Sequence, residues 1–340
     1  MFTTIEKIIN ASELKEELSI GSDLVLLKQK RDEEIKRILS GKDKRMLLII
    51  GPCSADNEDS VCNYCSILSR IAQEVKDKLL IIPRLYTTKP RSKGNRYRGM
   101  LHTPNSSTLI TQFNKGIYSS RRLMIKVLAE SGLSGADEML YPENYKFFDD
   151  LLSYVTVGSR SSENQEHRLV ASGLDVAVGI KNPMSGHLMG MLNSINVAQM
   201  PNDLIYNGMH MRTNGNQFAH AVLRGRIDAE GTLHSNYSGD DLAKLAQAYS
   251  KNEYNNRAVI IDANHANSQK TPVRQADIIM EVMDDMRGIV GDLIKGFMVE
   301  SYLVDGAQYP GGKVYGQSIT DGCIGIEKTR NLIYRIAERI

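Results

Sequence analysis

Residues 46–54 read Met-Leu-Leu-Ile-Ile-Gly-Pro-Cys-Ser, which is a run of large apolar residues that leads directly into a turn. An uninterrupted apolar run of this length predicts a β-strand covered on both faces, as in a parallel sheet. Gly51 and Pro52 end the run, because proline fixes the backbone direction and donates no hydrogen bond. We therefore expect a buried strand that presents the thiol of Cys53 at its end. Such a cysteine is ordinarily a small apolar core residue unless chemical partners lie beside it.

Beyond residue 45 the sequence alternates short apolar runs with longer amphipathic segments, which is typical of repeated β-α units. We expect strands at 46–51, 79–85, 136–139, 155–158, 176–180, 204–206, 258–262 and 296–300, and helices at 58–75, 119–131, 240–250 and 272–294. Eight strands over about 295 residues predict a single (β/α)8 TIM barrel. An open, doubly wound sheet is the alternative.

The first 44 residues precede this repeat and contain two helical patterns, at 12–17 and 23–39. We expect residues 1–44 to form an N-terminal helical extension that caps the barrel or contacts another subunit, with a catalytic barrel at 45–340. Residues 1–18 contain four glutamates and no apolar core of a signal peptide, and no apolar run is long enough to span a membrane. These features predict a cytoplasmic protein.

The charge of the chain is nearly balanced, with 42 Lys and Arg against 40 Asp and Glu and a net charge of +2. A balance of this kind provides no overall field that would attract nucleic acid or an anionic membrane, so we expect neither partner. Four scattered cysteines are too few for a disulfide scaffold. Any anion binding must therefore be local.

Polar side chains follow many of the predicted strands, where the catalytic groups of such barrels gather. One set combines a thiol, an imidazole and two carboxylates, which suits Mn²⁺, Fe²⁺, Co²⁺ or Zn²⁺; it comprises Cys53, His265, Glu300 and Asp321. A second set is cationic and suits a substrate with several anionic groups; it comprises Arg84, Lys89, Arg91, Arg160, Lys181 and Arg224. The alternatives are rim salt bridges and a buried histidine for the first set, and a solvated or nucleic-acid-binding loop at 89–98.

Seven short motifs occur in a characteristic order. They are Ile-Gly-Pro-Cys-Ser at 50–54, Lys-Pro-Arg at 89–91, Gly-Ser-Arg at 158–160, Leu-Arg-Gly at 223–225, Asp-Ala-Asn-His at 262–265, Met-Val-Glu-Ser at 298–301 and Tyr-Gly-Gln-Ser-Ile-Thr-Asp at 315–321. Together they resemble class I 3-deoxy-D-arabino-heptulosonate-7-phosphate (DAHP) synthase, also called phospho-2-dehydro-3-deoxyheptonate aldolase. The likeness runs from about residue 22 to the end of the sequence.

The resemblance implies a metal-dependent condensation of phosphoenolpyruvate with erythrose 4-phosphate, the first step of the shikimate pathway, with one divalent ion per subunit. By position it implies metal ligands at Cys53, His265, Glu300 and Asp321. It implies phosphoenolpyruvate contacts at Arg84, Lys89, Glu138, Ser159, Arg160, Lys181 and Arg224, and sugar-phosphate contacts at Pro90, Arg91 and Ser92. Lys89 and His265 are then the expected proton-transfer groups.

Some positions depart from the family pattern. Asp175 follows Ser-Gly-Leu where a small neutral residue is usual, and its carboxylate could repel the carboxylate of an aromatic amino acid effector. We therefore expect altered or weak aromatic inhibition, and family precedent implies a homodimer or homotetramer. One alternative function is a synthase that uses another aldose phosphate, which Lys-Pro-Arg-Ser at 89–92 disfavours. Another is a non-catalytic regulatory paralogue, which the intact ligand and cationic positions disfavour.

Overall fold

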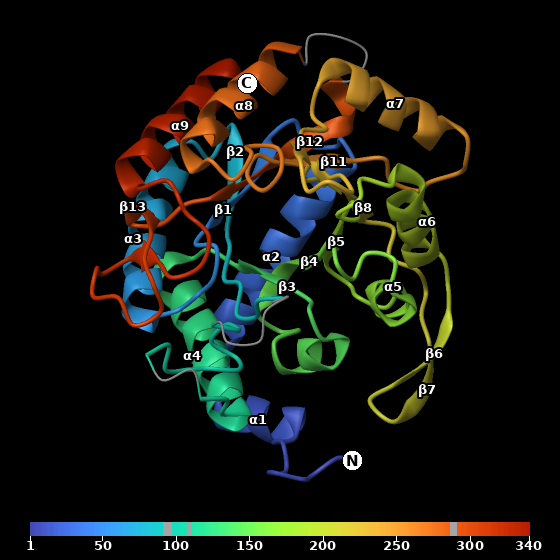
Figure 1. Cartoon of the computed structure of the whole chain (residues 1–340). Coiled ribbons are helices and arrows are strands. Elements are labelled where there is room, and N and C mark those ends of the chain that lie inside the picture. Colours follow the sequence, from blue (N-terminus) through green and yellow to red (C-terminus); the bar gives the residue numbers. More distant parts are fainter. Residues whose placement is uncertain (91–96, 108–109, 286–290) are drawn as a thin grey trace.

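The computed structural model describes residues 1–90, 97–107, 110–285 and 291–340. Eight parallel strands form one sheet in the order β2-β1-β12-β11-β8-β5-β4-β3 (Figure 1). They are β1 (Met46–Gly51), β2 (Leu79–Pro83), β3 (Gly135–Glu138), β4 (Leu152–Val157), β5 (Ala177–Lys181), β8 (Ala219–Leu223), β11 (Val259–Asp262) and β12 (Ile294–Glu300). A parallel bridge between Arg84 and Ala136 joins the two outer strands and closes the barrel. The predicted (β/α)8 barrel is confirmed.

The barrel strands are buried on both faces, and their alternate residues enter two different clusters. In β1, Leu47 and Ile49 belong to a cluster that receives side chains from all eight strands and fills the barrel interior. Leu48 and Ile50 belong to the larger cluster between the barrel and its surrounding helices. The two-residue period of a strand thus places one half of an apolar run inside the barrel and the other half under the helices.

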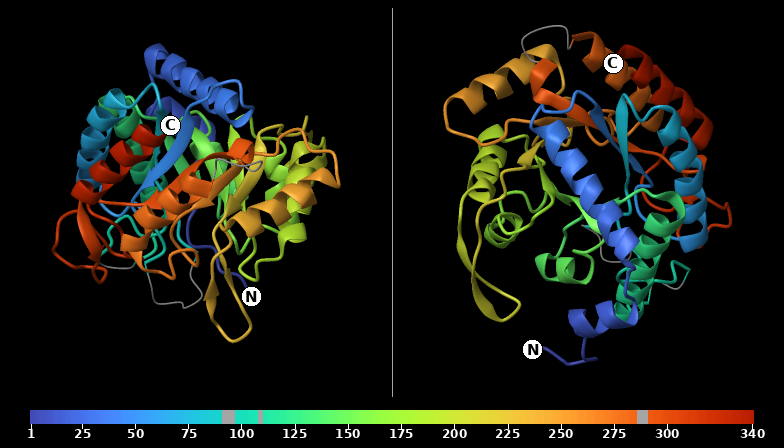
Figure 2. Two further views of the ribbon diagram at one scale, coloured as in Figure 1. Left: turned by 90° about the horizontal axis from the view of Figure 1, so that it is seen from above. Right: turned by 180° about the vertical axis from the view of Figure 1, so that it is seen from behind.

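The helix α2 (Ser22–Leu39) closes the end of the barrel at which the strands begin. Ile35, Ile38 and Leu39 join the interior cluster, and Figure 2 (right) shows α2 lying across the barrel on the side hidden in Figure 1. Lys36 Nζ lies 5.9 Å from the ring of Phe218, which directly precedes β8. The short helix α1 (Ala11–Glu17) precedes α2 in the chain and contacts the 3-10 helix η1 (Pro142–Phe147). The division at residue 44 stays a prediction.

Helices surround the barrel in the expected alternation. They are α3 (Glu58–Glu74), α4 (Phe113–Ser131), α5 (Gln165–Ala171), α6 (Leu188–Gln199), α7 (Gly239–Ser250), α8 (Gln275–Asp285) and α9 (Ile326–Arg339), with short 3-10 helices η1 (Pro142–Phe147), η2 (Pro272–Arg274) and η3 (Gly291–Leu293). The helix expected at 272–294 is divided into η2, α8 and η3, and its last residue, Ile294, is instead the first residue of β12. Residues 286–290 lie outside the described part of the chain. Among the described residues, no helix has both the length and the apolar character needed to cross a membrane.

The strand expected at 204–206 is present as β6 but is not part of the barrel, so its assignment as a barrel strand was wrong. β6 (Asp203–Tyr206) pairs antiparallel with β7 (Met209–Arg212) in a hairpin that projects beside α6 (Figure 1). The connecting Asn207-Gly208 has φ values of 53° and 72°, as a tight two-residue hairpin turn requires. The barrel strand is β8, which was missed because it reads Ala-His-Ala-Val-Leu and lacks a run of large apolar residues.

Short strand pairs complete the described structure. They are β9 (Arg226–Ile227) with β10 (Leu233–His234), and β13 (Val304–Ala307) with β14 (Gln317–Ser318). Both pairs follow the C-terminal ends of barrel strands, β8 and β12 respectively. They therefore lie at the C-terminal end of the barrel, where the candidate site residues were predicted.

Candidate active site

Cys53, Glu300 and Asp321 meet at the C-terminal end of the barrel. β1 and β12 are neighbouring parallel strands, and Gly51 at the end of β1 lies opposite Glu300. Cys53, two residues after Gly51, therefore lies near the Glu300 carboxylate. The Cys53 thiol, the Glu300 carboxylate and the Asp321 carboxylate offer ligand atoms that all lie within 4.8 Å of one another. The thiol also donates to Asp321 Oδ2 at 3.5 Å. Cys53 and Glu300 are buried and Asp321 is exposed, so the cluster is open on one side.

His265 completes the set that the sequence singled out. Its Nε2 lies 3.9 Å from Glu300 Oε1, and its Nδ1 lies 2.9 Å from Asp262 Oδ2. The backbone of His265 has φ of 54°, a left-handed conformation that turns the chain sharply after β11. One sulfur, one imidazole nitrogen and two carboxylates are a donor set suited to a divalent transition metal. The residues present therefore fit such an ion.

Burial governs the protonation of these groups. Burial, together with the nearby Glu300 carboxylate, raises the pKa of the Cys53 thiol to about 12. A metal ion must therefore displace the thiol proton in order to bind, which makes binding stronger at higher pH. Burial also lowers the pKa of His265, although Asp262 opposes this effect. The imidazole is thus neutral near pH 7, as a metal ligand must be.

Three polar side chains hold Glu300 in place, and only one of them, Arg84, was among the predicted site residues. Arg84 Nη2 lies 3.0 Å from Glu300 Oε1, and Asn264 Nδ2 donates to Oε2 at 2.6 Å. The amide of Gln275 contacts the backbone of Glu300 on both sides, at 3.0 and 2.8 Å. Asn264 lies within the Asp-Ala-Asn-His motif and could have been inferred from it. Gln275 carries no sequence signal, because its partner is distant in the chain.

A ring of cations surrounds Tyr86, a residue that the sequence interpretation missed. Arg84 Cζ lies 4.1 Å from the centre of its ring, and the Nζ atoms of Lys89 and Lys181 lie at 5.9 and 6.0 Å. The fully buried Tyr86 donates its hydroxyl hydrogen to Thr156 Oγ1 at 2.8 Å. An aromatic face attracts cations in a desolvated site. Tyr86 therefore offsets part of the mutual repulsion of the three cations.

Several guanidinium nitrogens in this region have no hydrogen-bond partner within the part of the chain that the structure describes. They are Nε and Nη1 of Arg84 and the same two atoms of Arg224, all buried. A buried donor without an acceptor is costly, so an anionic ligand at this position would be stabilising. Burial lowers the pKa of Arg224, and the nearby Arg160 adds to this effect, although Asp262 opposes it. Lys181 differs, since its Nζ lies 3.0 Å from Asp262 Oδ2.

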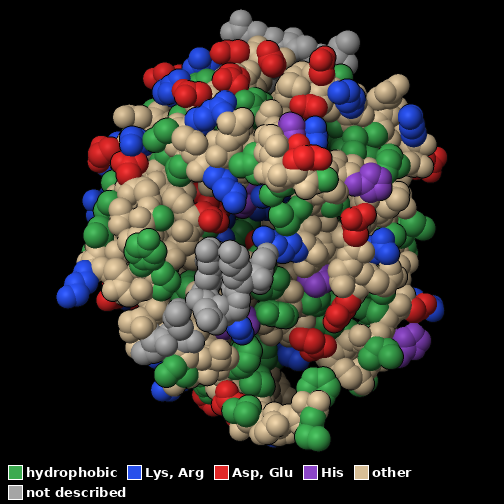
Figure 3. Space-filling view, viewed as in Figure 1, with side chains coloured by type: hydrophobic (Ala, Val, Ile, Leu, Met, Phe, Trp, Pro, Cys, Tyr) green, Lys and Arg blue, Asp and Glu red, His purple; other side chains and the backbone are tan. Residues whose placement is uncertain are grey.

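The remaining predicted residues lie around the same rim. Glu138 is the buried last residue of β3, and Ser159 and Arg160 follow β4, half-buried and exposed respectively. Gly158 leaves room for Glu138, because a Cβ at Gly158 would lie 2.2 Å from Glu138 Oε1. Pro90 is half-buried, whereas the predicted Arg91 and Ser92 lie outside the described residues. Figure 3 shows charged side chains of both signs and histidine around a hollow near the middle of this face.

Comparisons with known proteins agree with one another. The family model described as "DAHP synthetase I family" matches residues 18–333. The Phe-sensitive phospho-2-dehydro-3-deoxyheptonate aldolase of Escherichia coli (strain K12) is 34% identical over 314 residues, covering 90% of this chain and 87% of the relative. The Trp-sensitive enzyme of the same strain is 30% identical over 344 residues, covering 99% and 96%. A solved phospho-2-dehydro-3-deoxyheptonate aldolase from Francisella tularensis SCHU S4 superposes with a TM-score of 0.93 at 28% identity, covering 100% of this chain and 98% of that chain.

Proposed function

The chain is an enzyme of the DAHP synthetase I family, and we propose from this premise the reaction and the residues that carry it out. The reaction joins phosphoenolpyruvate, D-erythrose 4-phosphate and water to give 3-deoxy-D-arabino-heptulosonate 7-phosphate and phosphate. The proposal rests on one observation: a cluster of thiol, imidazole and carboxylate groups lies beside buried guanidinium donors that have no hydrogen-bond partner among the described residues.

The cationic residues bind the two acidic groups of phosphoenolpyruvate in this proposal. Arg84, Lys89, Arg160, Lys181 and Arg224 provide the positive charge, and the backbone near Glu138 and Ser159 contributes polar contacts. The free Nε and Nη1 atoms of two of these arginines, unpaired within the described residues, support the assignment, since a guanidinium binds phosphate and carboxylate through paired N–H groups. Pro90, Arg91 and Ser92 are proposed to hold the sugar phosphate.

Cys53, His265, Glu300 and Asp321 are proposed to hold one divalent metal ion, Mn²⁺, Fe²⁺, Co²⁺ or Zn²⁺. When bound, such an ion acts as a Lewis acid that polarises a carbonyl oxygen. The surrounding side chains orient the ligands: Arg84 and Asn264 fix the carboxylate of Glu300, and Asp262 lies beside Nδ1 of His265. Outer contacts of this kind maintain the geometry of a metal site.

The bond changes follow from the two substrates. C3 of phosphoenolpyruvate attacks the aldehyde carbon of erythrose 4-phosphate, water adds to C2, and phosphate leaves by cleavage of the C2–O bond. We assign to Lys89 the donation of a proton to the oxygen of the former aldehyde. Burial alone would lower the pKa of Lys89, but Cys53, Glu300 and Asp321 raise it, so the ammonium group persists near pH 7. His265 is proposed to transfer the proton of the attacking water or of the departing phosphate.

A separate outer pocket is proposed to receive any aromatic amino acid effector. It lies between α2, η1, the end of α5 and the β6–β7 hairpin, and two of the relatives are named Phe- and Trp-sensitive. Its lining contains the carboxylates of Asp32, Asp149, Asp150 and Asp175 and also the cations Lys28, Lys146 and Arg212. Because the Asp175 carboxylate would repel the carboxylate of an amino acid, we propose that aromatic inhibition is weak. Assembly as a homodimer or homotetramer and a cytoplasmic location stay predictions.

The test measures phosphoenolpyruvate consumption and phosphate release by the purified chain. Both should require erythrose 4-phosphate, stop after treatment with a chelator, and recover when one of the four metals is added back. Arabinose 5-phosphate in a parallel reaction tests the alternative aldose. No phosphate release from a metal-replete preparation would refute the proposal and favour a non-catalytic paralogue.

A further inference from the structure

The seam between β2 and β3 has less backbone pairing than the other strand junctions. Neighbouring barrel strands elsewhere pair over at least three residues. At this seam, the described residues show the bridge between Arg84 and Ala136 and a hydrogen bond from Leu85 N to Ala136 O at 2.8 Å. The backbone that continues beyond Leu85 leads directly to Lys89. Other contacts must therefore hold that segment against β3.

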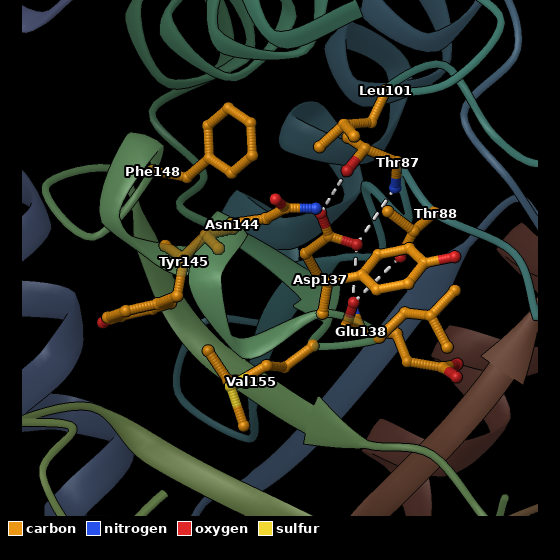
Figure 4. A pocket seen from close by; sticks show the side chains of 13 residues that line it. Thr87, Thr88, Leu101, Asp137, Glu138, Asn144, Tyr145, Phe148 and Val155 are labelled. Carbon is orange, nitrogen blue, oxygen red and sulfur yellow. Dashed lines mark hydrogen bonds between the residues drawn. The ribbon is translucent and has the colours of Figure 1, made fainter. Parts of the chain in front are cut away.

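The side chain of Asp137 provides these contacts. Its carboxylate accepts hydrogen bonds from Thr87 N at 3.0 Å, Thr87 Oγ1 at 2.6 Å and Glu138 N at 2.7 Å (Figure 4). Thr88 Oγ1 donates to Glu138 O at 3.1 Å. Side chains thus take the place of the backbone hydrogen bonds between strands, that of Asp137 at residue 87 and that of Thr88 at residue 88. They link the segment that leads to Lys89 with the strand that ends at Glu138.

Thr87 is also held from its other side. Its carbonyl oxygen accepts a hydrogen bond from Leu101 N at 3.0 Å, and Lys89 N donates to Arg98 O at 2.9 Å. The segment 87–89 is therefore fixed between Asp137 on one side and residues 98–101 on the other. A shift at Thr87 would move the backbone of Lys89 and Pro90.

Asp137 does not act as a counter-ion for the cationic site. It is 6% exposed and borders a cavity whose lining, which lies wholly within the described residues, contains no Lys, Arg or His. Figure 4 shows the cavity enclosed by Asn144, Tyr145, Phe148 and other side chains. Burial raises the pKa of Asp137 to about 7 although Thr87 and the Glu138 backbone donate to it. Asp137 therefore acts through the positions of its hydrogen bonds and not through a fixed negative charge.

We propose that Asp137 is a positioning residue that holds Thr87 and Thr88 against Glu138 and thereby sets the placement of Lys89 and Pro90 for the sugar phosphate. The inference rests on the roles proposed above for Lys89 and Pro90. Both protonation states of the carboxyl group can bridge the same partners. An asparagine can do so too, because its oxygen accepts the two N–H groups and its amide donates to the Thr87 hydroxyl.

The test compares Asp137→Ala and Asp137→Asn with wild type, each saturated with metal. Asp137→Ala should raise KM for erythrose 4-phosphate and lower kcat by roughly a hundredfold, because a misplacement of about 1 Å can cost that much. Its metal content should change little, and Asp137→Asn should restore most of the turnover. Asp43→Ala is the control, because it removes another ion-paired carboxylate, 2.8 Å from Arg45, just before β1 at the opposite end of the barrel. Its kinetics should match those of wild type.

Hydrogen exchange gives a readout that is independent of turnover. The amides of Thr87 and Leu101 should exchange faster in Asp137→Ala than in wild type and stay protected in Asp137→Asn. Kinetics of Asp137→Ala like those of Asp43→Ala, or no rescue by Asp137→Asn, would overturn the proposal. Wild type without turnover but with this exchange pattern would refute the proposed reaction and leave the bridge of Asp137 established.

Discussion

Replacing Asp262 by asparagine tests how the site stabilises its buried charges. The carboxylate is fully buried, and its Oδ2 lies 3.0 Å from Lys181 Nζ and 2.9 Å from His265 Nδ1. The amide of the variant would keep the shape of the side chain but lose its negative charge, and the ammonium of Lys181 would then lack a counter-ion at this position. Removal of one partner from a buried ion pair costs about 3–5 kcal/mol. We expect Asp262→Asn to lose roughly that much free energy of unfolding.

The direction of the pKa shift of Asp262 determines the pH at which its contribution to stability should be measured. Burial acts to raise the pKa of Asp262, but His265 and Lys181 outweigh burial and lower the pKa well below its usual value. Such a group stabilises the fold above its unfolded pKa of about 3.9 and loses this contribution as pH falls through the lower folded value. Unfolding by urea at pH 7, followed by circular dichroism, therefore measures the full penalty.

Asp203→Asn is the matched control. Asp203 pairs with Arg212 at 2.9 Å on the exposed hairpin, with side chains 48% and 75% exposed, so its loss should fall within the error of the measurement. A second readout follows from Lys181, whose pKa Asp262 raises against the lowering effect of burial. Loss of the Asp262 carboxylate would therefore lower the pKa of Lys181. KM for phosphoenolpyruvate should then begin to rise at a lower pH in the variant than in wild type. Equal stability of Asp262→Asn and Asp203→Asn would refute the reasoning.

Further predictions concern the ligands, the proton donor, the barrel floor and the effector. Cys53→Ser should lose bound metal and activity together with an unchanged circular dichroism spectrum, and full metal content would contradict thiolate ligation. Lys89→Ala should retain its metal but lose turnover by about 10²–10⁴-fold; normal turnover would eliminate Lys89 as the proton donor. Ile38→Ala on α2, where the side chain is fully buried, should cost about 2–5 kcal/mol in urea unfolding, whereas Leu26→Ala, 63% exposed on the same helix, should cost far less. Phenylalanine, tyrosine and tryptophan at micromolar concentrations should leave activity unchanged, and inhibition by any of them in that range would show that the Asp175 carboxylate does not exclude effectors.

The sequence alone predicted those strands that are marked by a continuous run of large apolar residues. β1 was predicted with its observed bounds, because a run of large apolar residues ends at Gly-Pro. β8 was missed because its stability depends on distant partners. His220 in its middle is fully buried and lies 2.7 Å, by Nε2, from the hydroxyl of Tyr154 on β4. The residues next to His220 in the sequence do not indicate that its side chain is buried and bonded to a tyrosine of another strand.

The candidate site shows the same division. Cys53, Glu300 and His265 could be predicted because each follows an apolar run, and parallel strands bring such positions to one end of a barrel. Tyr86, Asp262 and Gln275 were not singled out, because their contributions depend on contacts between different strands and loops. The motif could have suggested Asp262, but the role of Tyr86 as the aromatic face shared by three cations emerges only in three dimensions.

The place of β12 between β1 and β11 has a consequence for how the protein is made. The ribosome releases β1 first and β12 last among the barrel strands, so β1 keeps an open edge of apolar residues until about residue 300 has emerged. An open strand edge pairs readily with other chains, so the incomplete chain exposes a site for aggregation until β12 is made. Cys53 likewise stays apart from Glu300 and Asp321 throughout translation. A metal ion that uses all three of these side chains can therefore bind only after Asp321 has been synthesised.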